Sequence, residues 1–124
     1  MTDALAHTSK SAVAVKAFFR ITQAWELDRN AAATLLAVNV RTIDRWKSGA
    51  EPALSRDQLE RISYLLGIYG TLHALLGESP FADAWVASPN ADFGGRKPIE
   101  RLLAANVGDL ADVNRYVNAW AAGW

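Results

Sequence analysis

The sequence predicts an all-α protein, and two of its features carry that prediction. Apolar residues recur three and four positions apart in several separate segments, which is the spacing of one helical face. Residues that favour helix starts, such as Asp28, Asn39 and Ser55, stand directly before such segments, and glycines or prolines lie between them. We therefore expect helices joined by brief turns, with one longer irregular stretch over residues 85–98.

The composition limits the class of protein. With 124 residues, of which 51% are hydrophobic, the chain can bury the core of one domain, or of one domain with a small appendix. The sequence has no cysteine, which excludes disulfides, thiolate catalysis and cysteine-ligated zinc. No apolar run approaches the roughly 20 residues of a membrane span, and the N-terminus lacks a signal-peptide pattern. We expect a cytoplasmic protein that has no membrane partner.

The formal net charge is zero, but the charges are unevenly distributed. Residues 1–66 carry nine Lys and Arg against seven Asp and Glu, a balance of +2, whereas residues 67–124 carry four against six, a balance of −2. Any contact with nucleic acid should therefore lie in the first half of the chain. Because the total is neutral, affinity for DNA would require a dimer or a partner.

Residues 1–11 are mostly small and polar, and we expect a flexible tail in which His7 is solvated. The first helix should begin at Ala12, because Phe18, Ile21 and Trp25 then share one helical face.

Two short helices and a tight turn are predicted over residues 28–49. Asp28 can cap a helix that ends at Leu36, and Asn39 can cap a second helix that Gly49 ends. The apolar residues of the second helix fall on one face: Val40, Ile43 and Trp46. These features are typical of a helix-turn-helix, whose second helix enters the major groove of DNA.

The second helix and its ends carry the candidate DNA-binding residues. They are Asn39, Arg41, Thr42, Arg45, Lys47 and Ser48. Arginine side chains can reach guanine edges or phosphates, whereas Lys47 and Ser48 suit phosphate contacts. Asp44 would be repelled by phosphate, so it should read a cytosine amine or pair with Arg41. The alternative is a helical hairpin whose cations form only a solvated face.

A long helix is predicted over residues 55–76, with Ser55 and Gln58 as a capping box. It carries two apolar rows, of which one should cover the helix-turn-helix core. The other row needs a second partner, most simply another copy of the chain in a homodimer. Gly67 and Gly70 each weaken a helix, and we expect that another helix or backbone segment packs closely there. We expect His73 to be packed against the core.

The segment from Trp85 to Pro98 contains prolines, a glycine pair and two adjacent cations. An irregular segment of this length within a compact domain is usually functional or disordered, and the aromatic residues Trp85 and Phe93 argue against disorder. Pro98 should then begin another helix.

The last helix should be capped by Asp109 and should place Trp120 and Trp124 on its apolar seam. The terminal Trp124 either packs on the core of this chain or anchors a partner. Both alternatives stay open.

This order of features resembles the Xre/MbcA/ParS family of bacterial antitoxins. The resemblance rests on Trp85, Ser88-Pro89-Asn90 and Gly95-Arg96-Lys97-Pro98, which follow a helix-turn-helix, and it covers most of the chain beyond the first ten or so residues. It implies an Xre-like helix-turn-helix and dimerisation module over residues 12–77 and a toxin-binding domain over residues 78–124. It also implies that the chain covers the active-site entrance of a RES-domain toxin, an enzyme that destroys NAD, and represses its own operon.

The resemblance supplies most of the candidate toxin-binding residues, and the tryptophans add possible interface anchors. They are Trp85, Ser88, Pro89, Asn90, Phe93, Gly95, Arg96, Lys97, Pro98, Trp120 and Trp124. Gly95 and Pro98 should shape the backbone, whereas Arg96 and Lys97 should contact the toxin.

We expect no enzymatic activity, metal or cofactor, because the sequence lacks the motifs that carry such chemistry. The alternative function is a stand-alone helix-turn-helix regulator that uses its C-terminal domain for dimerisation or ligand sensing. A neighbouring gene for a RES-domain toxin would favour the antitoxin.

Overall fold

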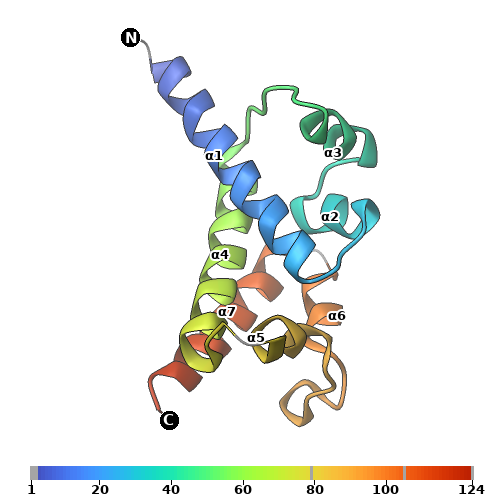
Figure 1. Cartoon of the computed structure of the whole chain (residues 1–124), viewed down its shortest axis with the longest axis vertical. Coiled ribbons are helices and arrows are strands. Elements are labelled where there is room, and N and C mark those ends of the chain that lie inside the picture. Colours follow the sequence, from blue (N-terminus) through green and yellow to red (C-terminus); the bar gives the residue numbers. More distant parts are fainter. Residues whose placement is uncertain (1–2, 79, 105, 124) are drawn as a thin grey trace.

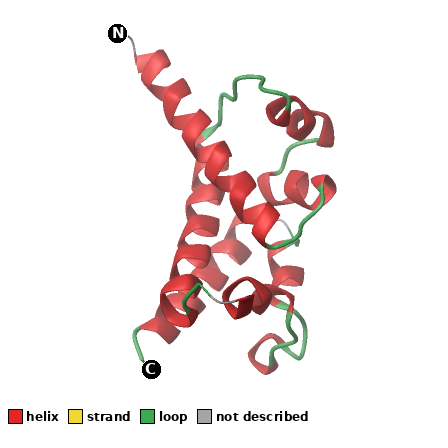
Figure 2. Ribbon diagram, viewed as in Figure 1, coloured by secondary structure: helices red, strands yellow, loops and turns green. Residues whose placement is uncertain are grey.

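The computed structural model describes residues 3–78, 80–104 and 106–123, with side chains from Lys10 onward, and every regular element in these ranges is a helix (Figure 1, Figure 2). In chain order the elements are α1 (Asp3–Ala24), α2 (Arg29–Leu36), α3 (Val40–Lys47), α4 (Arg56–Leu76), α5 (Pro80–Ala84), η1 (Trp85–Ala87), η2 (Ala91–Phe93), α6 (Pro98–Leu102) and α7 (Val107–Ala121), where η marks a short 3-10 helix. The prediction of an all-α fold is confirmed.

Helix α4 is the element on which the other helices pack. It contacts α1 and α2 from the N-terminal half of the chain and α5 and α7 from the C-terminal half (Figure 1). Its fully buried side chains Leu65, Ile68 and Leu72 belong to one continuous core with residues of α1 and α7. A single helix therefore fixes both halves of the molecule to each other.

The start of α1 differs from the expected flexible tail over residues 1–11. The helix begins at Asp3 and not at Ala12. Ser11 is fully buried, and its hydroxyl oxygen accepts a hydrogen bond of 3.1 Å from the backbone N–H of Leu54. This hydrogen bond joins two residues that are 43 positions apart in the sequence, and it fixes this part of the helix. Local composition does not predict such a contact. The side chain of His7 lies outside the described residues.

The helix-turn-helix elements form as predicted from their caps. The carboxylate of Asp28 accepts a bond of 2.8 Å from the N–H of Ala31 at the start of α2, and Asn39 accepts one of the same length from Thr42 at the start of α3. Each bond satisfies a backbone donor that the first turn of a helix leaves free. Ser55 and Gln58 form the predicted capping box of α4.

A buried arginine joins α2 to α4. Arg61 donates to the Asp57 carboxylate at 2.8 Å and to the backbone carbonyl of Leu35 at 3.3 Å. The carbonyl lies in the last turn of α2, where backbone acceptors lack helical partners. Arg61 thus fixes the end of α2 on the side of α4.

His73 joins α4 to α5. The centre of its ring lies 4.3 Å from the centre of the Tyr69 ring. Its Nε2 lies 2.8 Å from a carboxylate oxygen of Asp83. The histidine is packed, as the sequence led us to expect.

Helices α4 and α7 approach closely at one glycine. A Cβ atom on Gly67 would lie 2.5 Å from Oδ1 of Asn114, and one turn further on Thr71 donates a hydrogen bond of 3.0 Å to Asn118. The prediction of close helix packing is confirmed at Gly67 and is wrong at Gly70, where a Cβ atom would meet no atom within 4 Å.

The two glycines give a matched test of this packing. Gly70→Ala should raise the free energy of unfolding by up to about 1 kcal/mol, because alanine favours the helix and the site is open. Gly67→Ala should stabilise the fold less than Gly70→Ala, because the Oδ1 atom of Asn114 must move to admit the new Cβ atom. Chemical denaturation of both variants measures the difference, and equal stability of the two variants would contradict the close approach of α7.

Candidate functional site

The exposed face of α3 carries two arginines that no other described residue engages. Arg41 and Arg45 lie four residues apart, so they share one side of the helix. Neither guanidinium makes a hydrogen bond or ion pair within the described part of the chain. The predicted DNA-facing arginines are therefore free to meet a ligand.

The other candidate residues of α3 have partners within the chain. The hydroxyl of Thr42 donates to Asn39 at 2.9 Å, and that of Ser48 donates to the backbone carbonyl of Asp44 at 3.0 Å. The ammonium of Lys47 lies 5.6 Å from the centre of the Phe19 ring, within the range of a cation–π contact. Lys47 is exposed, and its one described contact of this kind is with α1.

Asp44 pairs with Arg29 and not with Arg41, so one of its two expected roles is wrong. The two charged groups approach to 2.6 Å. Arg29 is the first residue of α2, and 15 residues separate the partners in sequence. This ion pair joins α2 to α3 and offsets the one carboxylate of α3 that would repel phosphate.

Four aromatic side chains gather in the C-terminal half of the chain and form what we call the aromatic cluster. They are Trp85, Phe93, Tyr116 and Trp120. The Trp85 ring stacks on Tyr116 at 6.0 Å and on Trp120 at 6.2 Å between ring centres, and Phe93 meets Tyr116 edge-on at 5.1 Å. Trp120 remains 36% exposed, so the cluster has an open aromatic edge.

Sequence analysis predicted three members of this cluster and missed Tyr116. The spacing of Tyr116 could have identified it, because it precedes Trp120 by one helical turn and so shares its face of the helix. The expected role of Trp124 lies outside the described residues.

The loop over residues 88–97 is closed by its own backbone. The N–H of Asn90 donates to the carbonyl of Arg96 at 3.0 Å, and the N–H of Gly95 donates to the carbonyl of Asn90 at 2.9 Å. Gly94 and Gly95 both have positive φ angles, 68° and 80°, which glycine adopts without strain. Asn90 also accepts a bond of 2.9 Å from the N–H of Asp92, so Asn90 and Gly95 hold the shape of the loop.

Both ends of the loop are anchored to short helices. Ser88 donates to the carbonyl of Ala84 at 2.9 Å, whereas Pro89 is exposed. Pro98 is buried and begins α6, as predicted.

A hydrogen bond joins the loop to the aromatic cluster. The hydroxyl of Tyr116 donates to the carboxylate of Asp92 at 2.6 Å. This bond, followed by burial, raises the pKa of Tyr116 above its usual value. The loop and helix α7 therefore present one surface.

Arg96 and Lys97 are both exposed, and neither side chain has an ion-pair partner among the described residues. They line a hollow of about 330 Å³ between the loop and α6. Asp92, Phe93, Glu100, Arg101 and Ala104 complete its wall.

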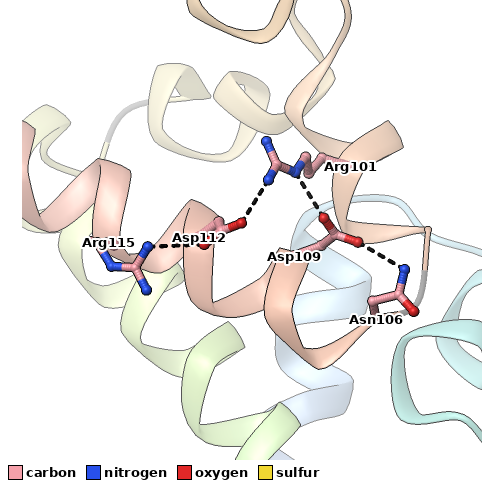
Figure 3. A network of polar contacts seen from close by, with 5 residues as sticks. All are labelled: Arg101, Asn106, Asp109, Asp112 and Arg115. Carbon is pink, nitrogen blue, oxygen red and sulfur yellow. Dashed lines mark hydrogen bonds and ion pairs between the residues drawn. The ribbon is translucent and has the colours of Figure 1, made fainter.

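Four charged residues of this half form an ion-pair network on α6 and α7 (Figure 3). Arg101 donates to Asp109 at 2.9 Å and to Asp112 at 2.7 Å, and Arg115 donates to Asp112 at 2.9 Å. The expectation that Asp109 caps the last helix is wrong, because α7 begins at Val107 with Asn106 at the N-cap position. Asp109 is drawn to Arg101 instead, and the network holds α6 on α7.

Sequence models of two protein families match the chain. The antitoxin Xre-like helix-turn-helix domain matches residues 4–67, and the antitoxin Xre/MbcA/ParS C-terminal toxin-binding domain matches residues 71–123. A relative from Sinorhizobium fredii, described as uncharacterized protein y4oB, is 34% identical over 110 residues, which are 88% of this chain and 84% of the relative. The chain belongs to the Xre/MbcA/ParS family of antitoxins.

Membership of this family defines two kinds of partner. The chain is an antitoxin of a toxin–antitoxin system, with a toxin as the partner of its C-terminal domain and DNA as the partner of its helix-turn-helix. The two matched regions meet within α4, the helix on which both halves of the chain pack. Within the described ranges, no helix is long and apolar enough to cross a bilayer, and no three His, Asp or Glu residues are placed to hold a metal ion.

The ion-pair network should make stability depend on pH. Hydrogen bonds from Arg101 and then from Asn106 hold the pKa of Asp109 below its usual value. A depressed pKa stabilises the fold above the unfolded-state value of about 3.9, and this contribution is lost as the pH falls through the folded-state value. The advantage of the wild type over Asp109→Asn in urea denaturation should therefore be full at neutral pH and shrink in acid. A difference that stays constant with pH would contradict this role of the carboxylate.

Proposed function

We propose that the chain neutralises a RES-domain toxin, an enzyme that degrades NAD, by covering the entrance of its active site. The observation that carries the proposal is the aromatic cluster beside the closed loop, within the region that matches the toxin-binding domain. Inhibition by this route is steric, since the bound antitoxin occupies the path that the substrate takes. It requires no chemistry from the antitoxin.

The aromatic cluster suits a tight interface. Tryptophan and tyrosine dominate the binding energy of many interfaces when they fill pockets on a partner. The ring contacts of Trp85 and the bond from Tyr116 to Asp92 hold the cluster in place before the toxin binds. A preorganised surface loses less conformational entropy on binding.

The candidate toxin-binding residues divide into two groups by their contacts in the free chain. Asn90, Gly95 and Pro98 act through the backbone shape of the loop. Trp85, Phe93, Arg96, Lys97 and Trp120 offer side chains to the toxin. Ser88 and Pro89 complete the proposed surface, and Trp124 remains a candidate outside the described residues.

We further propose that the chain acts as a homodimer that represses its own operon through α3. Arg41 and Arg45 would contact the DNA, with Asn39, Thr42, Lys47 and Ser48 around them. A neutral chain gains DNA affinity when two helix-turn-helix modules bind together. The proposal therefore needs a dimer interface away from α3.

An apolar groove between α1 and α4 offers that interface. Its volume is about 760 Å³, and its apolar residues include Val13, which is 70% exposed, and Leu66, which is 39% exposed. Its rim carries Lys10 and Arg56 together with Glu60. Because the rim carries both positive and negative side chains around an apolar centre, the same surface on two copies can pair about a two-fold axis.

Neutralisation of the toxin tests the proposed role of the aromatic cluster. Trp120→Ala should weaken binding of the RES-domain toxin by about tenfold or more, since a hot-spot residue contributes about 2 kcal/mol. Phe81→Ala is the matched control, because Phe81 is 74% exposed in the same half and makes no ring contact in the cluster. Binding and NAD loss are measured after co-expression.

Full neutralisation by Trp120→Ala would contradict the role of the aromatic cluster. Failure of the wild-type chain to bind the RES-domain protein would contradict the choice of toxin, and a stand-alone transcriptional regulator would then be the better account.

Dimerisation and DNA binding are tested together. Val13→Asp should place a charge in the groove, convert the dimer to a monomer in light scattering, and lower affinity for DNA upstream of the gene. Arg45→Ala should keep the dimer mass and weaken DNA binding by about 1–3 kcal/mol. A monomeric wild type, or a dimeric Val13→Asp, would show that this groove does not join two copies.

A further inference from the structure

The carboxylates and the cations of the C-terminal half differ in whether they have partners within the chain. Its carboxylates have partners: Glu78 and Asp83 lie near His73, Asp92 meets Tyr116, Glu100 meets the N–H of Lys97, and Asp109 and Asp112 meet Arg101. Two of its cations, Arg101 and Arg115, are neutralised by these carboxylates. Among the four cations of this half, Arg96 and Lys97 are the two whose side chains have no partner in the described part of the chain.

These two cations line one hollow, which we call the basic groove. It measures about 330 Å³ and lies between the loop over residues 88–97 and α6. Arg101 in its wall is paired with Asp109 and Asp112, which lie outside the groove. The carboxylates of the wall accept hydrogen bonds, Asp92 from the Tyr116 hydroxyl and Glu100 from the N–H of Lys97. The charged side chains of the groove that have no partner among the described residues are therefore Arg96 and Lys97.

We propose that the basic groove binds a carboxylate side chain of the toxin, an inference that rests on the proposed function. The Arg96 guanidinium has no partner among the described residues, and a guanidinium can hold a carboxylate through two parallel hydrogen bonds. Phe93 belongs both to the wall of the groove and to the aromatic cluster, so apolar burial beside the groove would reduce screening of the pair by water. A phosphate group would place up to two charges against Asp92 and Glu100 and fits the groove less well.

The charge of the groove also bears on how fast the complex forms. Complementary charges raise association rates and set the register of two surfaces. The aromatic cluster then supplies the apolar contact, and the basic groove fixes its orientation.

Charge reversal tests the inference. Arg96→Glu should weaken binding of the toxin by tenfold or more at low salt, with a smaller loss at high salt. Arg115→Glu makes the same change of charge on α7, where Arg115 is 75% exposed and lies outside the groove, and it should change binding less than threefold. Arg96→Lys should retain part of the affinity, and thermal unfolding of each variant checks that it folds.

A suppressor screen identifies the group on the toxin. The inference predicts that an Asp or Glu of the toxin, changed to Lys or Arg, restores binding to Arg96→Glu. If Arg96→Glu lost affinity only for toxin that has NAD bound, the groove would be shown to meet a nucleotide phosphate. That result would overturn the inference.

The outcomes also distinguish a failure of this inference from a failure of the proposed function on which it rests. Binding by the wild type with an unaffected Arg96→Glu overturns the basic groove alone. No binding by the wild-type chain overturns the proposed toxin partner and this inference with it.

Discussion

The burial of α4 between two sets of helices is the constraint on which the rest of the structure depends. Leu65, Ile68 and Leu72 are inaccessible to solvent, and they pack in one core with α1 on one side and α7 on the other. The absence of a side chain at Gly67 lets α7 approach closely. Because burial of such residues drives folding, the two halves of the antitoxin are expected to fold as one unit.

This arrangement separates the surface that we propose for DNA from the surface that we propose for the toxin. Helix α3 lies at one end of α4, and the loop over residues 88–97 lies towards the other end (Figure 1). Each surface is held by a contact from a neighbouring element, Arg29 to Asp44 at α3 and Tyr116 to Asp92 at the loop. The geometry is suited to an antitoxin that holds its toxin while its helix-turn-helix remains free to bind DNA.

The features that sequence analysis predicted depend on residues close together in the chain. Asp28, Asn39 and Ser55 cap their helices through bonds to residues three positions away, so a short window of sequence contains both partners. The features it missed depend on distant partners. Ser11 bonds to Leu54, Arg29 draws Asp44 away from Arg41, and Arg101 draws Asp109 out of a capping role. These pairings follow from how the helices pack, which periodicity alone does not specify.

The most direct test of the account is amide hydrogen exchange of the chain, alone and in complex with the proposed partner, a RES-domain toxin. The account predicts slower exchange on complex formation in peptides covering residues 85–98 and the C-terminal part of α7, with little change in α2 and α3. Protection confined to α1, α2 and α3 would contradict the claim that the aromatic cluster and its loop form the toxin-binding surface.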